Sequence, residues 1–184
     1  MNVVVYGCDN SGKTSLANHI ADKFGFEYVR SKGGPKMQTK EVLDYLEENL
    51  NNSKKSVFDR FSIIEEYTNG IVLRGKDRFD DEYIDKDHFL SQIDMFIYAC
   101  PSMDTVKNFG DREQMDGIID NIDKPRDLYT IFTENELACK GRPLFIFDWT
   151  KDSDYKKFDS WFEATVENTA NVKKILDFGT GAFA

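Results

Sequence analysis

The octapeptide GCDNSGKT, residues 7–14, decides the fold of this chain. It fits the pattern G-x-x-x-x-G-K-[ST], in which the glycines let the backbone curl until successive N–H groups point into one concavity. The helix that follows adds the positive end of its dipole to that concavity. In such a loop Lys13 reaches the β- and γ-phosphates of a nucleoside triphosphate, and the Thr14 hydroxyl ligates Mg²⁺. The octapeptide therefore predicts a phosphate-binding loop for ATP and Mg²⁺.

The sequence on both sides of the octapeptide provides the context that such a loop requires. Residues 3–6 form a continuous apolar run, which is typical of a strand buried on both faces. Residues 13–24 carry apolar side chains at helical spacing, and Gly25 ends that pattern. The loop thus follows a strand and opens a helix. The residues expected to contact ATP are Gly7, Asp9, Asn10, Ser11, Gly12, Lys13, Thr14 and Ser15.

Short β-rich runs alternate with helical stretches along the whole chain, which is typical of an α/β fold with a parallel sheet. Two of the expected helices are residues 62–67, which Asn69-Gly70 breaks, and residues 80–92. No Pro/Gly/Ser-rich linker or internal repeat interrupts the chain, so we expect a single domain over residues 1–184. The five expected strands are residues 3–6, 26–29, 56–59, 95–99 and 143–147.

Charge and composition restrict the class of protein further. The 184 residues include 24 Lys and Arg against 33 Asp and Glu, and the net charge of −9 argues against a broad surface for DNA or RNA phosphates. Three widely spaced cysteines without a C-x-x-C pair fit a reduced cytoplasmic setting. No run approaches the ~18 consecutive apolar residues of a membrane-spanning helix. We therefore expect a cytoplasmic protein with no membrane partner.

An acid and an arginine, Asp59 and Arg60, stand at the carboxyl end of the third expected strand. In an α/β sheet this edge is where ligands bind. The carboxylate suits the Mg²⁺ shell or the proton of an acceptor hydroxyl, and the guanidinium suits an acceptor phosphate. A surface salt bridge at a strand end is the alternative. Beside the phosphate loop, the pair indicates phosphoryl transfer, with Lys13, Asp59 and Arg60 as catalytic residues.

A phosphate loop alone does not separate a kinase from a GTPase or an ATPase motor. The chain is short for a motor, and it lacks the N-K-x-D motif that reads guanine. Another hypothesis, from a different class of protein, is a nucleotide-binding module that transfers no phosphate. Such a module, however, needs no acceptor clamp like Asp59-Arg60.

Together these motifs resemble the thymidylate kinase family of nucleoside monophosphate kinases, over most of the length of the chain. The phosphate loop is similar to that of the family, including Asp9 two residues after the first glycine. Residues 30–34, RSKGG, resemble the family's Arg-Glu-Pro-Gly-Gly segment and keep its arginine and both glycines. Residues 59–61, DRF, resemble its Asp-Arg-aromatic motif.

Weaker points of resemblance follow that motif. Tyr67 and Arg74 are similar to a tyrosine and an arginine of the family, each with the spacing off by one residue. Residues 111–113, DRE, and the later Tyr129 resemble the signature at which the family's lid ends.

The resemblance implies a three-layer P-loop kinase fold with strand order 2-3-1-4-5 and a short lid at about residues 100–126. It also implies transfer of the γ-phosphoryl group of ATP to a deoxynucleoside monophosphate, and a pyrimidine nucleotide is the acceptor that we expect first. Thr14 and Asp59 would hold the metal, and Arg112 would act catalytically from the lid. The implied acceptor-binding residues are Arg30, Arg60, Phe61, Tyr67 and Arg74.

The chain departs from this family in two places. Residues 100–110 hold Lys107 and no arginine, whereas the family has several arginines there. Arg112 is therefore the one candidate left to neutralise the charge that develops on the transferred phosphoryl group. Residues 71–88 instead resemble divergent P-loop kinases of viral genomes, some of which phosphorylate hydroxymethylated pyrimidines in DNA. This gives a second reading, in which DNA is the acceptor and the location is the host cytoplasm. A homodimer stays open in both readings.

Overall fold

The apolar run ahead of the phosphate loop forms β1, Asn2–Tyr6, and all five of its residues are buried. β1 pairs in parallel with β3, Ser56–Asp59, on one side and with β4, Met95–Ala99, on the other. β2, Glu27–Arg30, and β5, Leu144–Phe147, complete a five-stranded parallel sheet in the order β2-β3-β1-β4-β5. The expected strand order 2-3-1-4-5 is confirmed.

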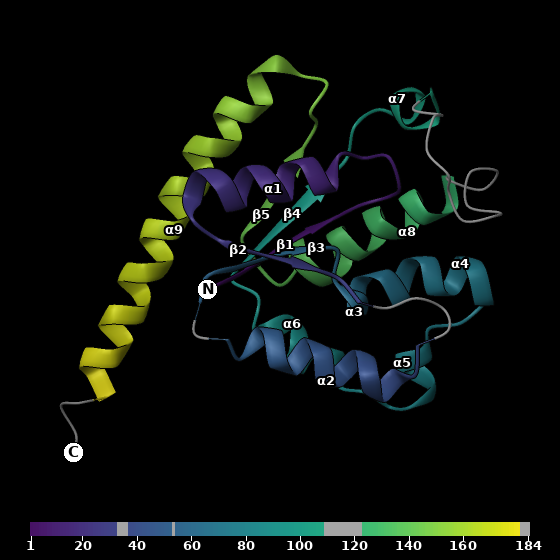
Figure 1. The fold of residues 1–184 in the computed structure, drawn as a ribbon, viewed down its shortest axis with the longest axis horizontal. Helices are drawn as coiled ribbons and strands as arrows, with labels where there is room; N and C mark the ends of the chain where they lie inside the picture. Colours follow the sequence, from purple (N-terminus) through teal and green to yellow (C-terminus); the bar gives the residue numbers. More distant parts are fainter. Residues whose placement is uncertain (33–36, 53, 109–122, 181–184) are drawn as a thin grey trace. The chain divides into compact units, whose positions relative to one another are not determined.

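The structure is a computed structural model that describes residues 1–32, 37–52, 54–108 and 123–180 (Figure 1). It divides into two compact units, Met1–Asp148 and Trp149–Ala184. The first unit contains the whole sheet, and the second contains the long helix α9, Asp152–Thr180. Whether the chain acts as one domain stays a prediction.

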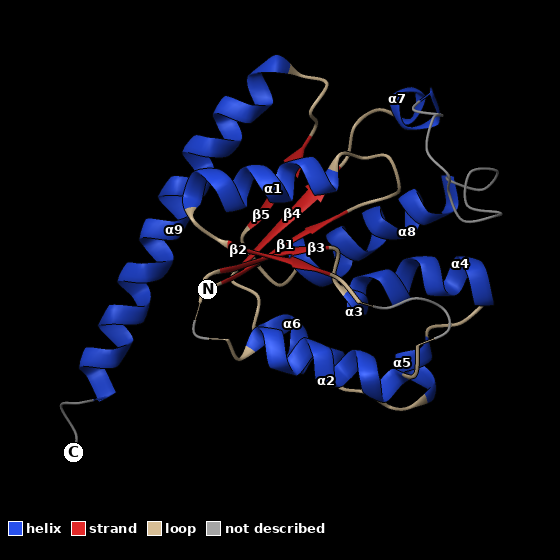
Figure 2. Cartoon of the chain, viewed as in Figure 1, coloured by secondary structure: helices blue, strands red, loops and turns tan. Residues whose placement is uncertain are grey.

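The helices of the first unit follow the strands in regular alternation, which matches the expected α/β class (Figure 2). Two of them, η1 and η3, are π-helical turns that continue the α-helix before them. The bounds are α1 Lys13–Phe24, α2 Thr39–Leu50, α3 Ser62–Glu65, η1 Glu66–Gly70, α4 Ile71–Arg74, α5 Arg78–Asp81, α6 Lys86–Ser91, α7 Met103–Asn108, α8 Asp123–Phe132 and η3 Thr133–Ala138.

The core of the first unit lies on the two faces of the sheet. Because side chains alternate along a strand, Val3 and Val5 face the side that α1 covers. Val4 and Tyr6 belong to the cluster on the opposite face, which α2, α6 and α8 help to form. With both faces covered, the sheet exposes its carboxyl edge, and the loops at that edge carry the candidate site.

Two helix expectations are wrong. The chain does not break at Asn69-Gly70 but stays helical from Ser62 to Arg74, with a π-helical turn in between. The Asn69 amide donates to Glu65 Oε2 at 2.8 Å, so its polar group is satisfied inside the helix. The expected helix over residues 80–92 is instead the pair α5 and α6, because a second capping aspartate, Asp85, starts a new helix after Asp77 has started the first.

No helix in the described part of the chain combines the length and the apolar character that crossing a membrane requires.

Candidate active site

The phosphate loop connects β1 to α1 and adopts the backbone conformation that its glycines predict. Gly7 has φ +143°, and a Cβ atom there would collide with the carbonyl oxygen of Ala99 on β4. Asn10 and Gly12 have φ of +61° and +86°, in the left-handed region. The loop thus ends at the N-terminus of a twelve-residue helix, which is a favourable place for phosphate groups.

Lys13 is buried beneath this loop, with only 4% of its surface exposed. Its Nζ donates to the carbonyl oxygen of Cys8 at 2.5 Å, which holds the ammonium group inside the loop. Burial, and after it the positive charge of Arg60, lowers the pKa of Lys13 from 10.5 to about 8. The loop therefore holds a desolvated cation that a triphosphate would stabilise.

Thr14 and Asp59 meet where the loop passes the end of β3. The Thr14 hydroxyl donates to Asp59 Oδ2 at 2.7 Å, and Asp59 is only 6% exposed. Asp59 Oδ1 is buried without a hydrogen-bond partner. A hydroxyl and an unsatisfied carboxylate oxygen fit Mg²⁺, which takes few protein ligands and completes its shell with water and substrate phosphates. Thr14 and Asp59 are therefore the residues that would hold the ion, which would neutralise charge on the phosphates.

Tyr28 on β2 also contacts Asp59, which the sequence did not reveal. Its hydroxyl donates to Asp59 Oδ2 at 2.7 Å, the same oxygen that Thr14 contacts. Burial and the hydrogen bond to Asp59 raise the pKa of Tyr28 to about 12. The phenol therefore keeps its proton, and remains a donor, throughout the physiological range.

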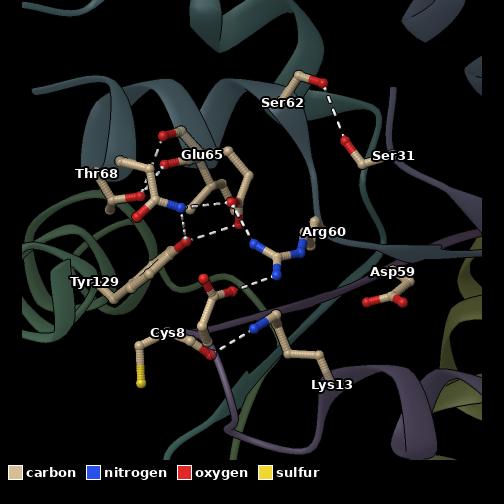
Figure 3. A network of polar contacts seen from close by, with 12 residues as sticks. Cys8, Lys13, Ser31, Asp59, Arg60, Ser62, Glu65, Thr68 and Tyr129 are labelled. Atoms are coloured by element: carbon tan, nitrogen blue, oxygen red, sulfur yellow. Dashed lines mark hydrogen bonds and ion pairs between the residues drawn. The ribbon is translucent and has the colours of Figure 1, made fainter. Parts of the chain in front are cut away.

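Arg60 connects the end of β3 to the phosphate loop (Figure 3). Its guanidinium donates to Asp9 of the loop through Nη2, and to Glu65 Oε2 through Nη1 at 3.0 Å. The backbone of Arg60 has φ +72°, an uncommon conformation for a residue other than glycine, and its N–H donates to Val5 O at 2.9 Å. Such conformations persist only where the surroundings enforce them, and they cluster at functional sites.

Glu65 anchors the far side of Arg60 and is the second residue that sequence reasoning missed. Its Oε1 accepts from the Tyr129 hydroxyl at 2.7 Å, and its Oε2 accepts from Asn69 as well as from Arg60. Tyr129 is fully buried, and Asn69 also donates to its hydroxyl oxygen at 3.3 Å. Figure 3 shows the resulting chain of contacts from the phosphate loop through Arg60 to α8.

The charges of this network balance one another. Burial alone would lower the pKa of Arg60, but Glu65 and Asp9 outweigh it and raise that pKa. Burial would raise the pKa of Asp9, but Arg60 and Lys13 outweigh it and lower that pKa. Asp9 and Arg60 therefore stay charged although both are largely buried. An anionic ligand would add negative charge beside Lys13 and Arg60.

The segment after β2 lies against the segment after β3. Ser31 N donates to the carbonyl oxygen of Asp59 at 3.1 Å, and the hydroxyls of Ser31 and Ser62 lie 3.2 Å apart. Ser62 also donates to the carbonyl oxygen of Lys32 at 2.9 Å. These bonds bring Arg30, an exposed residue at the end of β2, to the same sheet edge as Arg60.

The other residues expected to act on the acceptor have different outcomes. Phe61 is completely buried and packs edge-on against Phe58, and its contact with an acceptor stays a prediction. Tyr67 is half-buried, with its ring 5.3 Å from that of Phe132, which is a packing role. Arg112 and most of the expected lid lie outside the described residues.

Arg74 belongs to a second polar cluster at the end of α4. It pairs with the buried Glu66, whose Oε1 also accepts from Arg78 at 2.8 Å. Arg78 in turn donates to the carbonyl oxygen of Met37 at 2.7 Å, which joins α5 to the start of α2. This cluster borders a groove of about 450 Å³, within the size range of ligand pockets. The groove is lined by Met37, Gln38, Thr39, Lys40, Arg74, Arg78 and Glu82.

Replacing Glu66 with glutamine should destabilise the fold by about 3 kcal/mol, because it leaves two largely buried guanidinium groups without their shared carboxylate. Chemical denaturation measures this loss. Asp44→Asn is the matched control, since it breaks the exposed, solvent-screened Lys40–Asp44 pair and should leave the unfolding midpoint nearly unchanged. Equal losses in the two variants would contradict the role given to Glu66.

The parallel sheet in this strand order, with the phosphate loop at its carboxyl edge, defines a P-loop kinase fold. No protein-family model matches the sequence, and no curated protein matches it. Among solved structures, the chain is similar to the YorR protein from Bacillus subtilis in complex with phosphorylated GDP. The TM-score is 0.66 at 14% identity, over 92% of this chain and 98% of YorR.

A second similar structure is the deoxyadenosine kinase from M. mycoides, solved with the products dCMP and a flexible dCDP. Its TM-score is 0.57 at 18% identity, over 94% of this chain and all of that kinase. At such identities the likeness establishes the fold.

Proposed function

We propose that this chain is an ATP-dependent kinase that transfers the γ-phosphoryl group of ATP to a deoxynucleoside monophosphate, with a pyrimidine nucleotide as the preferred acceptor. The observation that carries the proposal is the contact of Arg60 with Asp9. This contact fixes a guanidinium beside the phosphate loop, at the edge where a second substrate must approach.

The donor half of the site rests on Lys13, Thr14 and Asp59. A buried ammonium group with a lowered pKa gains the most from the negative charge of a triphosphate. The Thr14–Asp59 pair supports Mg²⁺ at the adjoining position. Phosphoryl transfer asks little covalent chemistry of a protein, so the positioning of these charges supplies most of the catalysis.

The acceptor half rests on Arg60, together with Arg30 and the groove bordered by Arg74. Arg60 keeps N–H groups beyond those that bind Asp9 and Glu65, since a guanidinium has five donors. Arg30 lies at the same sheet edge, and the groove bordered by Arg74 offers room for the nucleoside part of an acceptor. The similar structures were solved with small nucleotides bound, which favours a small-molecule acceptor over DNA.

Transfer of label from [γ-³²P]ATP to a panel of acceptors tests this proposal. The panel contains dTMP, dCMP, dGMP, the free nucleosides thymidine, deoxycytidine and deoxyadenosine, and duplex DNA with 5-hydroxymethyluracil. We expect labelled diphosphate from a pyrimidine monophosphate. Labelled monophosphate formed from a nucleoside, or labelled DNA, would change the acceptor class and keep the kinase assignment. Tight ATP binding without turnover on any acceptor would instead indicate a nucleotide-binding module.

Nucleotide binding should take up protons in mildly alkaline solution. The pKa of Lys13 is about 8 in the free protein, and neighbouring phosphates raise the pKa of an ammonium group. We expect an uptake of about half a proton at pH 8, rising toward one at pH 9 and vanishing below pH 7, where Lys13 is already charged. ATP affinity should accordingly fall as the pH rises above 8.

Calorimetric titrations of Mg·ATP in buffers with different ionisation enthalpies measure this uptake. Lys13→Met is the control, because methionine binds no proton and should remove the dependence on buffer. An uptake that persists in that variant would assign the titrating group to another residue.

A further inference from the structure

Two donors converge on one oxygen of Asp59. The hydroxyls of Tyr28 and Thr14 both donate to Oδ2 at 2.7 Å, although the other carboxylate oxygen, Oδ1, is buried and has no partner. A buried carboxylate is normally satisfied at both oxygens, and a buried oxygen without a partner calls for an explanation such as a missing ion or water. The arrangement therefore reserves Oδ1 for a ligand.

The sheet explains how Tyr28 reaches this carboxylate. β2 and β3 pair in parallel with Tyr28 opposite Val57, so Asp59 lies two residues further toward the carboxyl edge. A tyrosine is long enough to span this diagonal between neighbouring strands. A shorter polar residue at position 28 would leave Oδ2 with one donor, and the carboxylate could then turn about its last side-chain bond.

We propose that Tyr28 is a positioning residue of the magnesium site. Its hydroxyl holds Asp59 so that Oδ1 stays available to the ion or to its bound water. The inference rests on the proposed function, since it assumes that Thr14 and Asp59 hold the Mg²⁺ of Mg·ATP. In metal sites, the groups that orient a ligand are typically worth a factor of about 10–100 in metal affinity or activity.

Tyr28→Phe tests this role, because it removes the hydroxyl and keeps the ring. The affinity for a fluorescent ATP analogue is measured with Mg²⁺ and again in EDTA, and the ratio of the two dissociation constants gives the magnesium advantage. We expect this advantage to fall about tenfold in Tyr28→Phe, with the affinity in EDTA unchanged. Catalysis should then require a correspondingly higher Mg²⁺ concentration for half-maximal rate.

Tyr45→Phe is the matched control. The Tyr45 hydroxyl donates to the carbonyl oxygen of Arg30 at 2.8 Å, at the end of the same strand and away from Asp59. Its loss should leave the magnesium advantage unchanged. An unchanged advantage in Tyr28→Phe would overturn the inference, and so would an equal loss of affinity with and without Mg²⁺, which indicates a structural role.

A double variant separates this inference from a general weakening of the site. Asp59→Asn should itself abolish most of the magnesium advantage, and adding Tyr28→Phe should then change it no further, because both residues act through the same carboxylate. Additive losses would mean that Tyr28 acts elsewhere. A wild-type protein without any magnesium advantage would refute the proposed donor site, and the inference with it.

Discussion

Replacing Lys13 with alanine is expected to reduce phosphoryl transfer by a factor of about 10²–10³ or more. Lys13 places a cation under the phosphate loop, where its Nζ donates to the carbonyl oxygen of Cys8, and we propose that this cation binds the β- and γ-phosphates. Removing one such preorganised charge typically costs a factor of about 10²–10³ in turnover. The rate of label transfer from ATP, under saturating acceptor, measures the loss.

The fold should survive this replacement. The pKa of Lys13 is about 8 in the folded protein, against 10.5 without the protein environment, so a charged Lys13 destabilises the ligand-free fold below pH 8. Neither Lys13→Ala nor the bulkier Lys13→Met should therefore lower the melting temperature by much. Lys23→Ala, at the exposed end of the same helix, is the control and should keep activity within about twofold. Near-normal transfer by well-folded Lys13→Met would refute the phosphate-loop assignment.

Replacing Arg60 with alanine should lower the acceptor-dependent kcat/KM at least about tenfold, and Arg60→Lys should do nearly as much. A tenfold loss corresponds to about 1.4 kcal/mol, close to the lower limit for one charge-assisted contact to an anion. Lysine keeps the charge but cannot bind Asp9 and Glu65 through one planar group while it also contacts an acceptor.

Arg60 is assigned to the acceptor, so its replacement should affect the kinetics of the acceptor and leave the affinity for ATP nearly unchanged. Steady-state kinetics should show the main effect in the acceptor's KM or in kcat, while calorimetry shows a change in ATP affinity of less than about threefold. Arg142→Ala, which removes a half-exposed guanidinium before β5, should leave both unchanged. If ATP binding were lost and acceptor binding kept, Arg60 would belong to the donor site.

The part of the site that could be predicted from the sequence is the part that motifs fix locally. The glycines of the loop require one backbone path, and a parallel sheet brings the ends of β1 and β3 to one edge, so Thr14 and Asp59 had to meet. Tyr28 and Glu65 were missed because their roles depend on the relative position of two elements. Tyr28 looks like an ordinary strand residue, and Glu65 like an ordinary helix surface residue.

The incorrect expectations have equally specific causes. Asn-Gly is a strong turn signal, but here Asn69 is satisfied by Glu65, and a Cβ atom on Gly70 would lie 2.8 Å from both Arg74 Nη2 and Glu66 Oε2. Gly70 thus leaves room for the Arg74–Glu66 ion pair within a continuous helix and makes no turn. The burial of Phe61 in the core was likewise not predicted from the sequence, whereas its contact with an acceptor stays a prediction.

The π-helical turn over Glu66–Gly70 makes this helix tolerant of a change in length. A π-helical turn holds one more residue than an α-helical turn, so the loss of one residue there can be absorbed by ordinary winding, with the helix still unbroken. We therefore expect the number of residues between Asp59 and Arg74 to differ by one among proteins that share this architecture. Sequence alignments of such proteins should place their gap inside this turn, and residues beyond it should be matched by their contacts instead of by their distance from the Asp-Arg motif.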